Sequence, residues 1–546
     1  MTAVEVTATR PSAVLDDAHV GDIHGALGTI RVGDVGARTT LSGKLKTLLA
    51  VVGPGLIVMV GDNDAGAFST YGQAGQSYGT RLLWTLLLLI PVLYVNQEMV
   101  LRLGAVTGVG HARLILARFG KFWGAFSVID LFILNALTIV TEFIGITLAA
   151  GYLGVPKAVA VLGAAAVIIA SAFTGSFRRF ERIAMTFCAG SLLLIPLYFM
   201  AHPSAAEMAR GFAVPGLPGG SGQMATVMLL VIGIVGTTVA PWQLFFQQSY
   251  VIDKRITPRF MRYEKADLWI GIVVVVIGAA ALMGATAAAF AGHRAGSFTD
   301  SAGLARGIAA YAGHFAGVVF AIALLDAAVI GAFAVSLSSA YAIGDVLGLN
   351  HSLHRGVGQA KGFYAVYAAL IGGAAAIVLI PGSPLGLITE GVQVLAGVLL
   401  PSATVFLLLL CNDREVLGPW VNGRRTNAFT SAVIAVLITL SVVLTASVLF
   451  PAISARQITG IIVACAAVSL LVGAGMLMRR RAAAPAAPGG ALTEADRSMW
   501  RMPPLAELSA PVVSAARKAG LTALRGYLAI AMILVIVKIV LMAVGH

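Results

Sequence analysis

The sequence predicts an all-α protein that crosses a membrane many times, and its composition and hydropathy pattern carry this prediction. Apolar residues make up 58 % of the 546 residues and charged residues only 11 %, and the mean hydropathy is +0.91. Runs of about 20 apolar residues, each long enough to cross the hydrocarbon core as a helix, recur from about residue 46 to 478. The sequence lacks the alternating ten-residue segments of a membrane β-barrel, so helices are expected.

Twelve spans are predicted in this core, followed by a thirteenth apolar segment near the end of the chain. In chain order the twelve cover 46–78, 81–103, 123–152, 155–174, 181–200, 223–252, 266–291, 313–346, 361–381, 387–411, 428–451 and 456–478. Two of them, the first and the sixth, are expected to be broken, at 61–66 and at 237–242. Both interruptions place glycine, proline or polar residues inside otherwise apolar helices.

Composition divides the chain into four parts. Residues 1–45 are polar, lack the apolar core of a secretion signal, and are predicted to be a flexible cytosolic tail. Residues 46–478 would form the transmembrane core. The Ala/Pro/Gly-rich segment 479–524 is predicted to be a flexible cytosolic linker. Residues 525–546 are predicted to form an apolar helix, either an extra span or a helix in the membrane interface, and we favour the span.

Basic residues are distributed unevenly between alternate loops. With a cytoplasmic N-terminus, the inner loops carry the basic groups at 113–121, 178–182, 254–265, 355–361 and 414–425, and the outer loops carry isolated ones. This asymmetry predicts a multi-pass protein of the cell membrane, plasma or inner, with its N-terminus in the cytoplasm. The net charge of +13 is dispersed over loops, so the expected partner is the lipid bilayer and not nucleic acid.

The spacing of the two broken helices predicts an inverted repeat. They are five spans apart, and an odd separation reverses the orientation of equivalent helices. Spans one to five and six to ten would then form a 5+5 pair in which each half begins with a broken helix. Secondary transporters built this way bind substrate near the bilayer midplane, where unwound backbone exposes carbonyl groups and half-helix ends.

The first break, GDNDAGAF at 61–68, contains the residues that favour a cation. Asp62, Asn63 and Asp64 would lie at membrane depth, where an isolated carboxylate costs about 2.5–3.5 kcal/mol and needs a partner. Carboxylate, amide and carbonyl oxygens suit hard divalent ions such as Mg²⁺ or Mn²⁺. The alternative is that Asp64 only caps the following half-helix, and the two roles are compatible.

The second break, GTTVAPWQLFFQQ at 236–248, contains Pro241, which would free carbonyl groups one turn back, around Thr237 and Ala240. An ordinary proline kink is the alternative. The three cysteines, Cys188, Cys411 and Cys465, have no metal-ligand spacing. The sequence also lacks a Ser/His/Asp or Cys/His constellation, HExxH and a dinucleotide fingerprint, so we expect neither an enzyme nor a cofactor.

Several of these motifs together resemble the NRAMP family of divalent metal transporters. The segment GPGLIVMVGDNDAGAFSTYGQAG resembles the first helix of that family, with its D-P-G-N motif aligned on residues 64–67. RLGAVTG at 102–108 and TEFIGITLA at 141–149 resemble the second and third helices. The family's M-P-H motif falls on residues 240–242, and VQVLAGVLLP at 392–401 matches the tenth helix. The resemblance covers about residues 46–411 and extends toward the two helices that follow.

The resemblance implies a set of metal ligands. These are the Asp64 carboxylate, the backbone carbonyls of Gly61 and Thr237, and the Gln393 amide in the closed state, while Asp62 and Asn63 would reach the water molecules of the ion. The divalent ion would be substrate, moved by alternating access, and a homo-oligomer is a possible assembly.

Two departures from the family pattern bear on the choice of ion. Ala67 occupies the position of the family's asparagine, and Ala240 that of its metal-selecting methionine. Loss of the thioether removes a preference for softer ions, and small residues leave room for an ion that keeps its waters, as Mg²⁺ prefers. Both departures resemble those of the NRAMP-related magnesium transporters.

Proton coupling is expected to be weak or absent. The family's third-helix aspartate falls on Ile139 and its sixth-helix histidine on Trp242, while the family's glutamate is retained as Glu142. None of the nine histidines falls in the middle of a predicted span, so no imidazole relay is expected there.

Three alternatives stay open. They are a Mn²⁺/Fe²⁺ proton symporter of the standard NRAMP type, an amino-acid or organic-cation carrier on the same fold, and a receptor that does not transport. Two aspartates at the first break disfavour an anionic substrate there, and the short tails disfavour a signalling domain.

Overall fold

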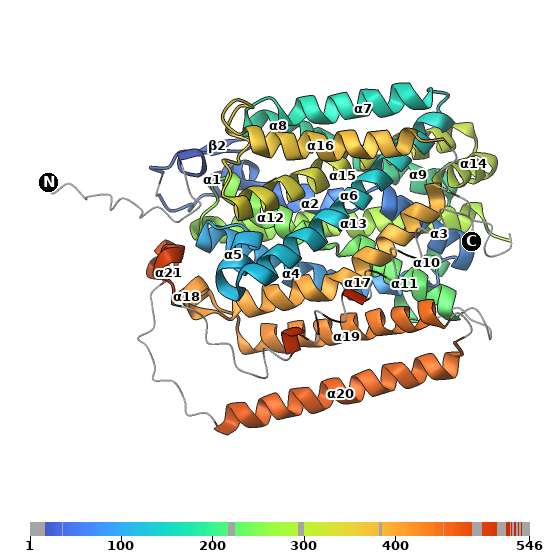
Figure 1. The fold of residues 1–546 in the computed structure, drawn as a ribbon. Helices are drawn as coiled ribbons and strands as arrows, with labels where there is room; N and C mark the ends of the chain where they lie inside the picture. The colour runs from blue at the N-terminus through green and yellow to red at the C-terminus, as the bar shows by residue number, and fades with distance from the viewer. Residues whose placement is uncertain are drawn as a thin grey trace, which may run out of the picture.

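The computed structural model describes residues 17–34, 36–216, 224–292, 300–381, 385–450, 453–482 and 494–509, with isolated residues and short runs between 520 and 537. This part of the chain forms a bundle of long helices (Figure 1). Within it, ten helical segments are long and apolar enough to cross a membrane, or eleven if a bent pair counts as one span. The predicted all-α, multi-pass architecture is confirmed.

The first half of the bundle runs from α1 to α10. Its helices are α1 (Leu41–Val51), α2 (Pro54–Gly61), α3 (Ala65–Tyr78), α4 (Trp84–Thr107), α5 (His111–Phe119), α6 (Lys121–Tyr152), α7 (Lys157–Ala172), α8 (Phe177–Gly190), α9 (Leu194–Ala201) and α10 (Ala205–Ala213), with a 3-10 turn at Ser191–Leu193. The segment from α8 to α9 forms one continuous span. Each of the first five predicted spans therefore corresponds to a helix or helix pair.

The second half runs from α11 onward. Its helices are α11 (Met224–Thr238), α12 (Pro241–Asp253), α13 (Met261–Ala289), α14 (Ser301–Ala312), α15 (His314–Leu347), α16 (Lys361–Leu379), α17 (Leu385–Cys411), α18 (Arg414–Leu417), α19 (Arg424–Leu449), α20 (Ala455–Ala482) and α21 (Glu494–Met499), with 3-10 turns at Pro258–Phe260, Gly418–Trp420 and Leu505–Glu507. The remaining seven predicted spans match helices here.

Both helix breaks occur where they are predicted, as the inverted-repeat fold requires. Residues 62–64 separate α2 from α3, and residues 239–240 separate α11 from α12. Pro241 opens α12, where its missing N–H costs no helical hydrogen bond. The third and eighth spans, α6 and α15, are equivalent in the repeat and share the most extensive helix contact in the described chain.

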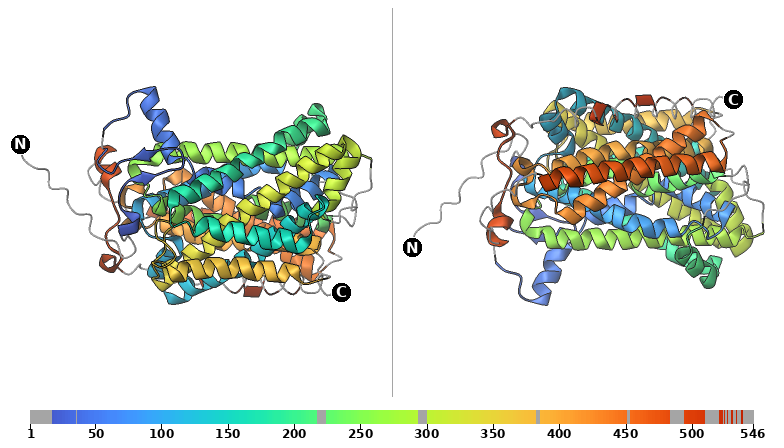
Figure 2. Two further views of the ribbon diagram at one scale, coloured as in Figure 1. Left: turned by 90° about the horizontal axis from the view of Figure 1, so that it is seen from above. Right: turned by 90° about the horizontal axis from the view of Figure 1, so that it is seen from below.

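The broken helix pairs lie in the core of the bundle, and other helices lie at its periphery. Helices α7 and α16 lie together on one side, and α20 lies apart on the opposite side (Figure 1). The apolar window of α20 is only 6 % buried, as expected for a helix that faces lipid. Helix α1 projects outward at one end of the bundle in both views of Figure 2, with a bend of 51° between it and α2.

The N-terminal segment differs from the predicted flexible tail. From residue 17 on it contains a 3-10 turn (Asp17–His19) and two short antiparallel strands, β1 (Ile23–His24) and β2 (Thr29–Ile30). Ile23 and Ile30 are buried in a cluster with Ala50 and Val51 at the end of α1. These apolar residues anchor the segment. They are too few and too scattered to form a peak in a hydropathy plot.

The region predicted as a flexible linker is also partly ordered. Residues 494–509 contain α21 and a 3-10 turn, and the Met502 N–H donates to the Val106 carbonyl at the end of α4 (3.4 Å). The guanidinium of Arg497 lies over the Trp420 ring. The predicted C-terminal helix 525–546 lies almost wholly outside the described residues.

Candidate metal site

The first break is built around Asp64, which caps α3. The Asp64 carboxylate (Oδ1) accepts a hydrogen bond from the Ala67 N–H at 2.8 Å, so the capping role weighed from the sequence is present. Asp64 is 3 % exposed and Ala67 is fully buried. The cap directs one carboxylate oxygen toward the helix N-terminus, whose partial positive charge favours an anion.

Gln393 from α17 lies directly over the first turn of α3. A Cβ atom added to Gly66 would be 1.7 Å from Gln393 Nε2 and 3.1 Å from Asp64 Oδ1. A side chain at position 66 would displace the Gln393 amide from its place beside Asp64, which explains the glycine here. Gln393 Nε2 is buried without a hydrogen-bond partner, and a turn of the amide by 180° would present its oxygen instead.

Glu142 on α6 completes the acidic side of this region. Its Oε2 accepts a hydrogen bond from the Ala65 N–H at 3.1 Å, next to Asp64. Gly331 on α15 packs against both, since a Cβ there would lie 2.8 Å from Glu142 Cδ and 2.9 Å from Asp64 Cβ. Glu142 therefore holds the start of α3 and touches the predicted ligand at the same time.

Asp62 points into a polar network that the sequence did not single out. Its Oδ1 accepts from Gln243 Nε2 on α12, and Gln243 Oε1 accepts from Gln97 Nε2 on α4 at 2.7 Å. The Tyr71 hydroxyl on α3 lies 2.6 Å from Thr238 Oγ1 at the end of α11, beside the second break. The only sign of this network in the sequence is a set of uncharged amides and hydroxyls inside apolar runs. Such residues are common where membrane helices pack, so they do not mark a site.

Asn63 is directed away from this network. Its Nδ2 donates to the Val275 carbonyl on α13 at 3.2 Å, and its side chain lines a water-sized cavity with Ser191 and Asp326. The predicted contact of Asn63 with the water shell of an ion stays a prediction.

Residues of the second break lie against those of the first. Thr237 and Ala240 are 2 % and 5 % exposed, and the hydroxyl of Thr237 lacks a hydrogen-bond partner. Trp242, at the start of α12, lies against Gly61: a Cβ added to Gly61 would be 3.4 Å from the Trp242 ring. The two breaks are thus in contact, as their predicted pairing requires.

The charges at this site are unbalanced. Asp62 Oδ2 and Glu142 Oε1 are buried without hydrogen-bond partners, and the ion pairs found among the described residues involve neither of these acids nor Asp64. Buried, unpaired carboxylates are costly. In the described chain no three His, Cys, Asp or Glu side chains are placed to hold a metal, so an ion here would need amide and carbonyl oxygens as well.

The chain is similar in sequence to known proteins. The chain is 30 % identical over 413 residues to the divalent metal cation transporter MntH of Ralstonia nicotianae, covering 72 % of this chain and 89 % of that protein. It is 31 % identical over 294 residues to the MntH protein of Erwinia tasmaniensis, covering 52 % and 69 %.

A solved structure shares the fold. The crystal structure of the Eremococcus coleocola manganese transporter, in complex with an aromatic bis-isothiourea substituted compound, matches with a TM-score of 0.62 and 20 % identity. The match covers 82 % of this chain and 99 % of that one. The sequence of residues 55–447 matches the family described as Natural resistance-associated macrophage protein-like. This chain belongs to that family, the NRAMP family.

Proposed function

We propose that this protein carries divalent cations across a membrane by alternating access, with Mg²⁺ or Mn²⁺ as the preferred ion. The observation that carries the proposal is the pair of buried carboxylates, Asp62 and Asp64, at the break between α2 and α3 without a basic partner among the described residues. A divalent ion would neutralise them. The relatives named as divalent metal cation transporters support the same substrate class.

The proposed ligand set combines side chains and backbone. Asp64 and Gln393 flank Gly66 on one side, and the carbonyls of Gly61 and Thr237 would contribute from the two half-helix ends. These are oxygen donors, which favour hard ions. The ion is transported cargo and not a resident cofactor, and it would enter with part of its water shell, since Ala67 and Ala240 leave the site lined by methyl groups.

The test of transport is uptake into proteoliposomes, with Mg²⁺, Mn²⁺ and Ca²⁺ compared at equal concentration. We expect saturable uptake of Mg²⁺ or Mn²⁺ that depends on Asp64. Labelled leucine and choline test the alternative of an organic-solute carrier. Uptake of either, with no divalent flux, would overturn the proposal.

Ala240 is proposed to set the selectivity among divalent ions. The substitution Ala240→Met would add a thioether at the start of α12, and we expect the ratio of Mn²⁺ or Cd²⁺ to Mg²⁺ uptake to rise by at least about tenfold. Ala240→Leu is the matched control because it adds similar bulk without sulfur. An equal ratio in both variants would show that residue 240 does not contact the ion.

Proton coupling is proposed to be weak or absent. Trp242 replaces the histidine of the family pattern, and Glu142 is engaged by the Ala65 N–H at the start of α3, which supports a role in holding the helix. We expect metal uptake without acidification of the vesicle lumen, measured with a trapped pH-sensitive dye. Acidification in step with metal entry would instead identify a proton symporter of the standard type.

The proposed location is the plasma or inner membrane, with the N-terminus in the cytoplasm. The uneven distribution of loop charges supports this orientation. Under it, the end of the bundle that carries β1, β2 and α21 (Figure 1) is the cytoplasmic end.

A further inference from the structure

The N-terminal segment of residues 18–30, here called the strap, lies across one end of the helix bundle. It touches three separate parts of the bundle: the end of α1, the start of α8, and the segment just after α12. Its apolar side chains Ile23, Ala26 and Ile30 are each at most 5 % exposed. A segment expected to be a mobile tail is therefore part of the packed structure at this end.

Arginines hold the strap through its backbone carbonyls. Arg178 on α8 donates to the Gly25 and Gly28 carbonyls at 3.2 and 3.4 Å, and Arg182 donates to the Ala26 carbonyl at 3.0 Å. After α12, the Arg255 guanidinium donates to the Ala18 carbonyl at 2.8–2.9 Å and to the Asp22 carbonyl at 3.0 Å. Hydrogen bonds from a charged donor are stronger than those between neutral groups.

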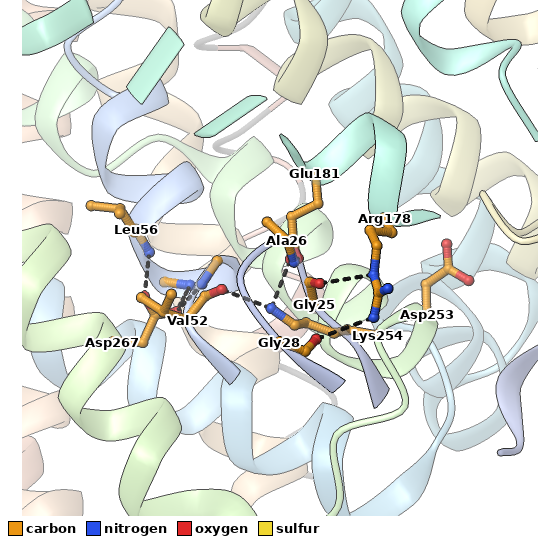
Figure 3. Close-up of polar contacts among 12 residues, drawn as sticks. Gly25, Ala26, Gly28, Val52, Leu56, Arg178, Glu181, Asp253, Lys254 and Asp267 are labelled. Atoms are coloured by element: carbon orange, nitrogen blue, oxygen red, sulfur yellow. Dashed lines mark hydrogen bonds and ion pairs between the residues drawn. The ribbon is translucent and has the colours of Figure 1, made fainter. Parts of the chain in front are cut away.

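The strap also binds an ion pair beneath it, which Figure 3 shows. The Ala26 N–H donates to Glu181 Oε2 at 2.5 Å. Glu181 Oε1 accepts from Lys254 Nζ at 2.7 Å, and both side chains are fully buried. Lys254 Nζ donates in turn to the Val52 carbonyl at 2.8 Å, two residues before α2 begins.

Helix α2 is also held by hydrogen bonds at its N-terminal end. The Asp267 carboxylate of α13 accepts from the N–H groups of Gly53, Gly55 and Leu56 at 3.2, 2.6 and 3.2 Å. The strap, the Glu181–Lys254 pair and the start of α2 thus form one continuous set of contacts. Helix α2 ends at Gly61, beside the candidate metal site.

Aromatic rings close the space between the strap and that site. Phe177 and Phe180 on α8 face Tyr250 on α12 at 4.9 and 6.5 Å between ring centroids. Phe246 stacks on Tyr250 at 5.0 Å, and Phe333 on α15 meets Phe180 edge-on at 5.7 Å. These rings join α8, α12 and α15, and the strap contacts α8 and the segment after α12.

We propose that the strap is an inhibitory latch: its backbone clamps α8, the end of α1 and the segment after α12, and it must detach before an ion can leave at the cytoplasmic end. This inference rests on the proposed alternating access and deepens it by naming the contact that keeps one gate shut. The strap would lower the population of an open state, and cysteine labelling measures that population without a transport assay.

The glycines of the strap offer a sharp test. A Cβ added to Gly25 would lie 2.0 Å from the Ala50 carbonyl oxygen, so Gly25→Val must push the strap off α1. Gly33, just beyond β2, has no atom within 4 Å of an added Cβ, and Gly33→Val is the matched control. On α8, Arg178→Ala with Arg182→Ala removes the clamp, and Arg179→Ala, at an exposed position, is its control.

The reporter is a cysteine at Ala334 in the full chain, with the three native cysteines replaced by alanine. Ala334 lies on α15 beside the end of α2: a Cβ added to Gly61 would be 3.6 Å from its Cβ, and it is 1 % exposed. A membrane-impermeant maleimide is applied to inside-out membrane vesicles. We expect Gly25→Val and the double arginine variant to label at least about tenfold faster than the parent and both controls, the factor that one lost charge-assisted hydrogen bond represents.

A second reporter keeps the result decisive. Ala50 is 1 % exposed beneath the strap, so labelling of Ala50→Cys shows directly whether the strap has detached, and deletion of residues 2–30 enforces detachment. If Ala50→Cys labels rapidly while Ala334→Cys labels at the parent rate, the latch is overturned. Failure of metal uptake in the parent would overturn the proposed function and leave this result unaffected.

Discussion

Replacing Asp64 with asparagine is expected to lower the initial rate of divalent-metal uptake into proteoliposomes by at least about 100-fold, the upper range for loss of a group that supports a metal site. The substitution separates the two roles of Asp64. Asparagine caps a helix about as well as aspartate, so the hydrogen bond to Ala67 and the start of α3 should persist. What disappears is the negative charge beside Gln393.

The matched control for this experiment is Asp300→Asn. Asp300 also caps a helix, α14, by accepting from the Gly303 N–H at 2.7 Å, but it lies outside the candidate site. We expect normal uptake from Asp300→Asn and closely similar thermal unfolding midpoints for both variants. If Asp64→Asn transports at the parent rate, Asp64 is a cap only and the ion binds elsewhere.

Replacing Lys254 with methionine should produce the largest loss of stability. Lys254 is the fully buried partner of Glu181, and its removal leaves Glu181 with only the Ala26 N–H among the hydrogen bonds described here. Breaking a buried pair by removing one partner costs about 3–5 kcal/mol, because a buried charge stays uncompensated. The measurement is the thermal unfolding midpoint of the purified protein in detergent.

The double variant Lys254→Met with Glu181→Met tests that explanation. Removing both charges leaves no uncompensated carboxylate, so most of the lost stability should return. Asp34→Ala removes the exposed partner of Arg38 and should leave the midpoint nearly unchanged. If the double variant is as unstable as Lys254→Met alone, the cost comes from lost packing or from the Val52 carbonyl and not from charge.

Much of the fold was predictable because the bilayer imposes its own length on apolar helices. The predicted spans correspond to helices of the structure, and both breaks lie at the predicted residues, where Asp64 and Pro241 begin new helices. Local chemistry decides these features: a proline cannot continue a helix, and an aspartate caps one. The family assignment followed from the same short motifs, and the match over residues 55–447 confirms it.

The polar partners of the site were less predictable. Gln243 on α12 donates to Asp62, and Gln97 on α4 donates to Gln243. An amide in an apolar helix gives no sign of which neighbour it will meet. Asn63, predicted to reach the water molecules of the ion, donates to the Val275 carbonyl on α13. Asp62 and Asn63 are adjacent in the break after α2, and only the packing of the surrounding helices decides which neighbour each side chain meets.

The sequence by itself determined where the chain becomes helical, where two helices break, and which acids lie in the first break, since these depend on residues close together in the chain. Only the tertiary structure decided that the N-terminal segment is a strap and that Glu181 pairs with Lys254, 73 residues away. Such contacts arise when the helices pack and exclude water, because buried polar groups must then find partners wherever the fold brings them.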